Sequence, residues 1–127
     1  MQDTRRILIV DDQNFNIDAS KIILKYSIKL CDCNEIIDSA LDGQLALDKV
    51  KENVLANGNK KCSYGLILMD CNMPHMDGYE STHQIRSFLY SLKIDQPIIV
   101  AVTGHSEPEY VARAINSGMN QVLSKPM

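Results

Sequence analysis

Three short runs of apolar, largely β-branched residues recur along the chain and constrain its fold more than any other feature. They cover residues 7–10, 66–69 and 98–102. Continuous apolar runs of this length are typical of strands buried on both faces, as in a parallel sheet. Two weaker candidates for strands of the same sheet are residues 35–37 and 121–123. We therefore expect strands that are covered on both faces.

Segments with the apolar spacing of a helix separate these runs. Their apolar stripes consist of Phe15, Ala19, Ile22, Ile23 and Tyr26; of Leu47, Val50 and Val54; of Ile85, Phe88, Leu89 and Leu92; and of Val111, Ala114, Ile115 and Met119. Residues 77–80 and 106–109 have the arrangement of a capping box at a helix start, and Gly118 suits a helix end. The alternation predicts an α/β fold, a parallel sheet with helices on both faces.

Composition narrows the class of protein. The 127 residues have the size of one domain, residues 1–127, and their net charge of −3, without a basic run, argues against nucleic-acid binding by this domain alone. No apolar run approaches the roughly 20 residues of a membrane span, and no signal peptide precedes the first strand. We expect a cytoplasmic domain without membrane contact. Its four cysteines, Cys31, Cys33, Cys62 and Cys71, are expected to be free thiols rather than metal ligands.

Polar side chains follow the predicted strands at the points where the strands end. Asp11 and Asp12 follow the first predicted strand (7–10), Asp70 follows the third (66–69) and Thr103 the fourth (98–102). Lys125 comes after the fifth (121–123). The carboxyl ends of parallel strands share one edge of the sheet, where ligands bind in such folds. Three carboxylates at one edge repel one another, and Mg²⁺, which prefers oxygen ligands, would compensate their charge. The set fits the transfer of a phosphoryl group onto a carboxylate.

From about Arg6 to Met127 the chain resembles the receiver domains of two-component response regulators. Residues 7–12, 68–80, 101–104 and 117–126 carry the resemblance. The long middle stretch, LMDCNMPHMDGYE, most resembles the receivers of hybrid histidine kinases. The resemblance implies a doubly wound, flavodoxin-like sheet of five parallel strands in the order 2-1-3-4-5. It also implies a signalling phosphoacceptor in a His-to-Asp phosphorelay rather than an enzyme with an outside substrate.

By the same resemblance, Asp70 is the phosphoacceptor, and its partner is a histidine kinase or a histidine phosphotransfer protein. The remaining implied roles are Mg²⁺ (or Mn²⁺) binding by Asp11, Asp12, Asp70 and the backbone carbonyl of Asn72, and phosphoryl binding by Thr103 and Lys125. Receivers have a cis bond before the proline that follows this lysine, so the bond between Lys125 and Pro126 is expected to be cis.

Two features depart from the receiver pattern. Receivers usually have Tyr or Phe three residues before the lysine, where this sequence has Val122, so the usual aromatic switch is not expected here. The fifth helix of the family, which would follow Pro126, is missing from the given sequence. Strands 7–10 and 121–123 are then expected to lack a cover on one sheet face. Further residues, a second copy of the chain (a homodimer) or a ligand or partner helix would fill that place.

Three other functions are alternatives to that of a phosphorylated receiver. A flavodoxin-type FMN carrier needs a phosphate loop rich in Ser, Thr and Gly after the first strand, whereas residues 11–14, DDQN, would repel a phosphate. A phosphatase with an aspartyl-phosphate intermediate would have Asp-x-Asp, but residues 70–72 are DCN. The third alternative is a degenerate receiver that acts only as a protein interaction module. Such receivers lose the acidic pair or the lysine, and this sequence keeps both.

Overall fold

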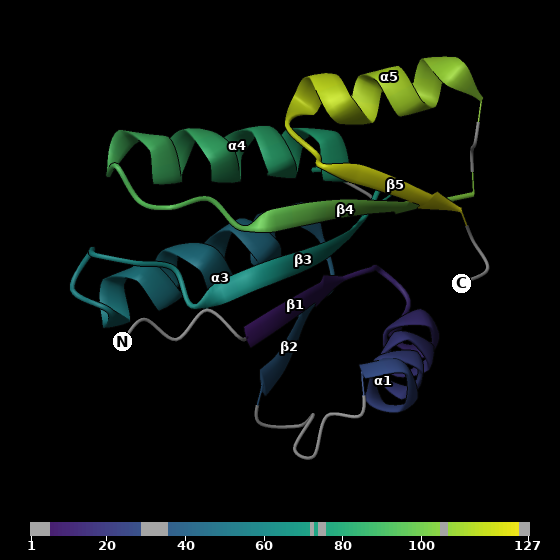
Figure 1. Cartoon of the computed structure of the whole chain (residues 1–127), viewed down its shortest axis with the longest axis horizontal. Helices are drawn as coiled ribbons and strands as arrows, with labels where there is room; N and C mark the ends of the chain where they lie inside the picture. Colours follow the sequence, from purple (N-terminus) through teal and green to yellow (C-terminus); the bar gives the residue numbers. More distant parts are fainter. Residues whose placement is uncertain (1–5, 29–35, 72, 74–75, 105–106, 125–127) are drawn as a thin grey trace.

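The computed structural model describes residues 6–28, 36–71, 73, 76–104 and 107–124, with the side chains of 25–28 excepted. Five parallel strands form one sheet in the order β2-β1-β3-β4-β5, as the resemblance implied (Figure 1). The strands are β1 (Arg6–Val10), β2 (Ile37–Ala40), β3 (Tyr64–Asp70), β4 (Ile98–Thr103) and β5 (Gln121–Ser124).

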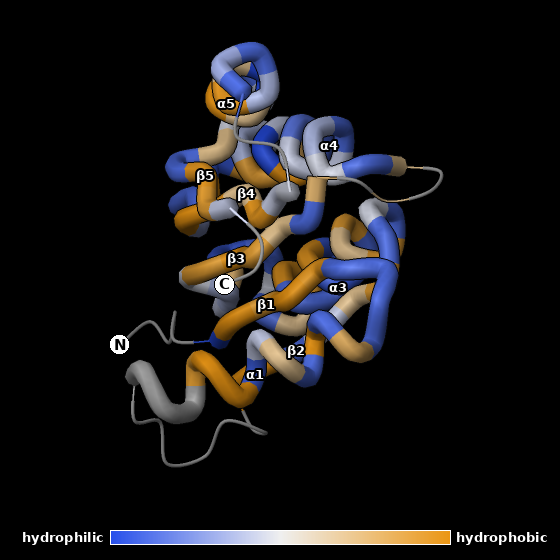
Figure 2. The backbone as a smooth tube through the Cα atoms, turned by 90° about the vertical axis from the view of Figure 1, so that its right-hand side faces the viewer, coloured by the Kyte–Doolittle hydropathy of each residue, from blue (hydrophilic) through white to orange (hydrophobic). Residues whose placement is uncertain are grey.

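Helices cover both faces of the sheet. The four helices of the described residues are α1 (Asn14–Ile28), α3 (Gly43–Ala56), α4 (Gly78–Ser91) and α5 (Pro108–Ser117). The face that carries Leu8, Ile67 and Ile99 packs against α3, α4 and α5. The opposite face, with Ile9 and Leu68, packs against α1. Figure 2 shows the middle of β1 and β3 in the orange of hydrophobic residues, as expected for strands buried on both sides.

The predicted apolar stripe of α1 is wrong. Phe15 is 81% exposed and Ile22 is 57% exposed, whereas Ile17 and Ser20 are buried. The backbone N–H groups of Asn16 and Ile17 both donate to the carbonyl of Gln13. Ile17 packs in the cluster with Ile9 and Leu68, so the helix presents the face of Ile17 to the sheet. Helical spacing alone is satisfied by either face, and packing against the sheet selects one.

Two predicted boundaries also differ from the structure. The second strand begins at Ile37 rather than at residue 35. Helix α5 begins at Pro108, and its N-cap is Glu107, whose side chain makes no capping bond. Ser106 lies outside the described residues. The predicted helix end is confirmed, because Gly118 has a left-handed φ of 112°, which favours glycine.

The expectation of an uncovered β1 is wrong as well. Ile7 and Ile9 are buried in the cluster that includes Ile17 of α1. The same expectation for the last strand is met, because Leu123 of β5 is exposed on this sheet face, as is Ile98 of β4. They belong to the strands farthest from β1 and α1 in the sheet.

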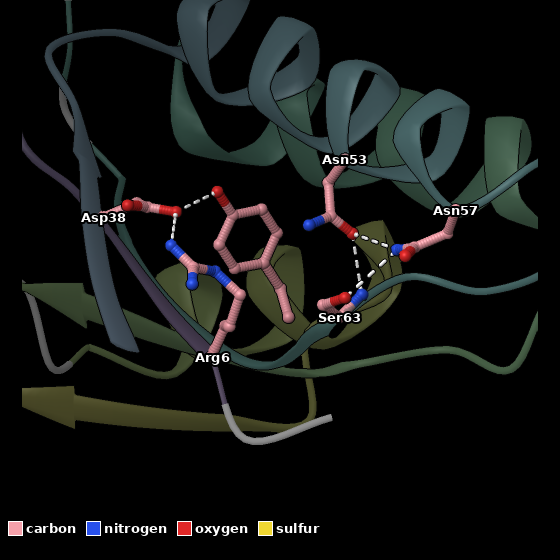
Figure 3. A network of polar contacts seen from close by, with 6 residues as sticks. Arg6, Asp38, Asn53, Asn57 and Ser63 are labelled. Atoms are coloured by element: carbon pink, nitrogen blue, oxygen red, sulfur yellow. Dashed lines mark hydrogen bonds and ion pairs between the residues drawn. The ribbon is translucent and has the colours of Figure 1, made fainter. Parts of the chain in front are cut away.

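A polar network fastens the amino ends of the strands, at the edge opposite Asp11 and Asp70. The carboxylate of Asp38 accepts hydrogen bonds from Arg6 at 2.8 Å and from the hydroxyl of Tyr64 at 2.5 Å. Beside it, the side-chain oxygen of Asn53 accepts the backbone N–H of Ser63 at 2.7 Å (Figure 3). The end of α3 is thereby tied to the start of β3.

Arg86 joins α4 to the chain around β5. Its guanidinium donates to the carbonyls of Gly118 at 2.8 Å and Pro97 at 2.7 Å, and to the side-chain oxygen of Asn120 at 2.7 Å. The same oxygen of Asn120 accepts the backbone N–H of Ile99 at 2.8 Å. One half-buried side chain therefore links α4, β4 and the turn before β5.

Candidate functional site

Three carboxylates meet at the carboxyl ends of β1 and β3, which are neighbours in the sheet. One oxygen from each of Asp11, Asp12 and Asp70 lies within 4.8 Å of the other two. Asp11 and Asp70 are buried, and Asp12 is partly exposed. The structure thus brings together the three acidic residues that the strand-end rule singled out.

The carboxylate of Asp11 is held from the start of α1. Its Oδ1 accepts the backbone N–H of Gln13 at 3.0 Å and the side-chain amide of Asn16 at 3.3 Å. Its own backbone N–H donates to the carbonyl of Ala40 at 3.1 Å, which continues the pairing of β1 with β2. Asp11 is therefore fixed through both its backbone and its side chain. The sequence analysis missed Asn16, whose only signal was its place in the first turn of the helix that follows the acidic pair.

The chain that follows Asp70 is held by β4 and α4. The N–H of Cys71 donates to the carbonyl of Val102, and the carbonyl of Cys71 accepts the N–H of Gly78, both at 3.3 Å. Asp77 caps α4, because its side chain accepts the N–H of Glu80 at 2.9 Å. The predicted capping position is confirmed. The sheet edge that carries Asp11, Asp12 and Asp70, called the acidic edge below, therefore lies next to the capped first turn of α4.

A glycine at the start of α3 ties the two helix starts together. Gly43 donates its N–H to the carbonyl of Met76 at 3.2 Å, and its carbonyl accepts the hydroxyl of Ser81 at 2.9 Å. A Cβ at position 43 would overlap the same carbonyl of Met76. The close approach of the two segments therefore requires glycine at this position.

Thr103 ends β4 and is 2% exposed. It follows Val102, the residue that pairs with Asp70, so it belongs to the same edge of the sheet. Thr103 pairs in turn with Ser124, after which Lys125 follows in the sequence. Lys125, its bond to Pro126, and Asn72 lie outside the described residues.

The donor set fits a divalent cation. Carboxylate oxygens are the ligands that Mg²⁺ prefers, and Mg²⁺ is usually held by one or two carboxylates together with water and phosphate oxygens. Two of the three carboxylates here are buried, and a cation would offset their mutual repulsion at this distance. Asp11, Asp12 and Asp70 can therefore hold Mg²⁺ or Mn²⁺. The two described cysteines, Cys62 and Cys71, are buried and form no disulfide, as expected. Cys31 and Cys33 lie outside the described residues.

Tyr79 and Arg113 extend the contacts of this edge to α5. Burial, together with the charge of Cys71 and a hydrogen bond with its thiol, raises the pKa of Tyr79 to about 12. The guanidinium of Arg113 lies 4.1 Å from the centre of the Tyr79 ring and 3.5 Å from the carboxylate of Asp77. Sequence reasoning had not singled out this pair, because 34 positions separate its members.

Residues 7–127 match the family model of the response regulator receiver domain. The chain belongs to this family. A receiver is a signalling phosphoacceptor domain of two-component systems rather than an enzyme with an outside substrate. Across the described part of this receiver, no helix combines the length and the apolar character that a membrane crossing requires.

Relatives of this receiver include histidine kinases. The osmosensing histidine protein kinase SLN1 of Saccharomyces cerevisiae is 38% identical over 122 residues, which cover 96% of this chain and 9% of that protein. Hybrid signal transduction histidine kinase B of Dictyostelium discoideum is 35% identical over 130 residues, covering 96% of this chain and 6% of that protein. The receiver therefore spans less than a tenth of the length of either kinase.

Solved receiver structures share the fold. The receiver domain of histidine kinase CKI1 from Arabidopsis thaliana, complexed with Mg²⁺, is 30% identical with a TM-score of 0.83, covering 98% of this chain and 88% of that chain. The same domain has also been solved with Mg²⁺ and BeF₃⁻. A co-crystal structure of the Saccharomyces cerevisiae phosphotransfer protein Ypd1 with the receiver domain of Ssk1 matches with 28% identity and a TM-score of 0.78, covering 100% of this chain and 82% of that chain.

Proposed function

We propose that residues 1–127 form one receiver domain of a His-to-Asp phosphorelay, in which Asp70 accepts the phosphoryl group. The cluster of Asp11, Asp12 and Asp70 carries this proposal. An acidic cluster at the carboxyl ends of neighbouring strands suits the transfer of a phosphoryl group more than the binding of an anion alone, because a bare anion would be repelled.

The proposed chemical step is a displacement at phosphorus. A carboxylate oxygen of Asp70 attacks the phosphorus of a phosphohistidine, the new O–P bond forms, and the N–P bond to the imidazole breaks. The electron pair of that bond leaves with the imidazole of the partner protein, and Asp70 becomes an acyl phosphate. Water later attacks the phosphorus and releases inorganic phosphate, which returns the carboxylate.

Asp11, Asp12, Asp70 and the backbone carbonyl of Asn72 would hold Mg²⁺ or Mn²⁺. When bound, the cation neutralises charge on the phosphoryl oxygens and on the carboxylates. Thr103 would donate its hydroxyl to one phosphoryl oxygen, and the ammonium of Lys125 would pair with another. Asp11 and Asp12 follow β1, and Asp70 and Thr103 are the last residues of β3 and β4, which supports the assignment.

The output of the switch would not depend on an aromatic ring at position 122. Val122 is partly buried against the core under α3, α4 and α5. A valine side chain is too short and too stiff to swing between a buried and an exposed position as a ring can.

The proposed partner is a histidine kinase or a histidine phosphotransfer protein. Its support is the similarity to a receiver that was crystallised with a phosphotransfer protein and to receivers within histidine kinases. This domain could be one part of such a hybrid kinase.

Phosphorylation with a small phosphodonor such as acetyl phosphate tests the proposal. We expect Mg²⁺-dependent labelling that hydroxylamine removes, as it does from an acyl phosphate. Asp70→Asn should abolish the label without lowering the thermal unfolding midpoint, because the amide is nearly isosteric, carries no charge to repel Asp11 and Asp12, and is no nucleophile. Asp95→Asn, at an exposed position outside the acidic cluster, is the matched control and should label normally.

Two outcomes would overturn the proposal. Full labelling of Asp70→Asn would place the acceptor elsewhere. No labelling of the unmutated protein, either by the small donor or by a phosphorylated phosphotransfer protein, would favour the degenerate receiver that acts only as an interaction module.

A further inference from the structure

Asn16 makes a contact that helix formation does not require. It is the third residue of α1, and its backbone N–H already donates to the carbonyl of Gln13. Its side-chain amide points instead at the acidic edge and donates to Oδ1 of Asp11 at 3.3 Å. A capping asparagine would accept a backbone N–H with its side-chain oxygen, whereas here the nitrogen donates to a carboxylate.

Two donors meet on the same oxygen of Asp11. The backbone N–H of Gln13 reaches Oδ1 at 3.0 Å, beside the amide of Asn16. A carboxylate oxygen has about two lone-pair directions, so these two donors occupy those of Oδ1. The plane of the carboxylate is thereby set.

The donor sits on a rigid support. Ile17, the next residue of α1, is 2% exposed and packs in the cluster with Ile9 and Leu68 of the sheet. Side chains that orient a metal ligand from such a support raise the precision of the site, and their loss typically weakens metal affinity about 10- to 100-fold.

We infer that Asn16 is a positioning residue for the cation site. It holds the Asp11 carboxylate in the orientation that binds Mg²⁺. The inference rests on the proposed function, because it concerns the metal that Asp11 and Asp12 would hold. It goes beyond that function by assigning part of the metal affinity to a side chain that itself touches neither the metal nor the phosphoryl group.

A Mg²⁺ titration of the unphosphorylated protein, followed by NMR amide shifts at constant ionic strength, tests the inference. Asn16→Ala and the bulkier Asn16→Leu should each raise the dissociation constant for Mg²⁺ about tenfold or more. The matched control is Asn14→Ala, an exposed asparagine of the same helix turn, which should stay within about twofold of the unmutated protein. Melting curves in EDTA show whether each variant is folded.

The dependence of phosphorylation on Mg²⁺ adds a second readout. With acetyl phosphate, Asn16→Ala should need about tenfold more Mg²⁺ for half its maximal rate. At saturating Mg²⁺ its rate should return to within about twofold of the unmutated protein, since the residue acts through the metal site. A variant that was merely less well folded would be recognised by its melting curve in EDTA, because Mg²⁺ also stabilises the folded state of such a variant.

Each outcome decides a separate question. Mg²⁺ affinity within twofold of normal in both Asn16 variants overturns the inference, as does an equal loss in Asn14→Ala. An unmutated protein that binds Mg²⁺ without being phosphorylated overturns the proposed function, while the Asn16 result is still judged by the titration. An unmutated protein that binds no Mg²⁺ at millimolar concentration overturns the inference and the metal part of the proposed function together.

Discussion

Gly78, the first residue of α4, lies directly against the backbone carbonyl of Asp70. A Cβ built on Gly78 would overlap that carbonyl oxygen and would come within 3.0 Å of the Cα of Cys71. All the atoms that would be contacted belong to the backbone, so no side chain can swing aside. The helix start and the proposed phosphoacceptor therefore approach each other as closely as they do only because residue 78 has no side chain.

Gly78→Ala should destabilise the fold by about 1–3 kcal/mol, because either α4 or the end of β3 must shift. Urea unfolding measures the loss, and phosphorylation by acetyl phosphate should slow at the same time, since the shift displaces Asp70. Gly104→Ala is the control, because a Cβ there meets no atom within 4 Å. Equal stability of the two variants would contradict the proposed close contact.

Arg86→Ala should cost about 3 kcal/mol of folding free energy. The substitution removes the bonds to Gly118, Pro97 and Asn120 and leaves two partly buried carbonyl oxygens without their donor. Arg86→Lys should recover only part of the loss, since an ammonium cannot reach three separate acceptors in one plane. Arg113→Ala, which removes a largely exposed guanidinium, should cost less than about 1 kcal/mol in the same urea titration.

The Asp38 network predicts a specific loss of stability in acid. Burial alone would raise the pKa of Asp38, but hydrogen bonds from Tyr64 and Arg6 outweigh burial, so the pKa lies below its ordinary value of 3.8. A carboxyl group whose pKa is lower in the folded state stabilises the fold above the unfolded value, and this contribution is lost as the pH falls through the folded value.

Asp38→Asn should therefore be less stable than the unmutated protein at pH 7. The difference should stay constant down to about pH 4 and shrink below it, because the unmutated carboxyl is then protonated as well. Urea unfolding midpoints at several pH values measure this. A difference that widened in acid would have the wrong sign, and Tyr64→Phe should show a smaller effect, since Arg6 still pairs with Asp38.

Asp12→Ala should raise stability in metal-free buffer by about 0.5–1 kcal/mol at low salt. The reason is the repulsion among three carboxylates whose oxygens lie within 4.8 Å, and the gain should shrink as salt screens it. Millimolar Mg²⁺ should raise the melting temperature of the unmutated protein and leave that of the variant nearly unchanged. A variant that melted lower in EDTA and still responded to Mg²⁺ would place the cation elsewhere.

The strands and the acidic edge could be predicted from local patterns. Residues 66–69 are apolar without interruption because β3 lies at the centre of the sheet, covered on both faces. The residue that follows such a run then lies at the carboxyl edge of the sheet, so the sequence alone predicts that Asp11 and Asp70 lie together. Buried parallel strands leave this signal because each of their residues must be apolar until the strand leaves the core.

The inward face of α1 and the support of the acidic edge could not be predicted in this way. Phe15 and Ile17 both lie on apolar stripes with helical spacing, and spacing says nothing about which stripe meets the sheet. The same holds for the contacts of Arg86 with Gly118 and of Gly78 with Asp70, since partners far apart in sequence leave no periodic trace.

By itself, the sequence therefore determined the order of the elements, the sheet and the residues that carry its chemistry, because these follow from local hydrophobicity and from the direction of parallel strands. Only the tertiary structure decided how those residues are held. Asn16 donates to Asp11 because packing of Ile17 against the sheet selects the inward face of the helix. Hydrogen bonds and close backbone contacts depend on distances of a fraction of an ångström between elements, and residue type and spacing do not contain that information.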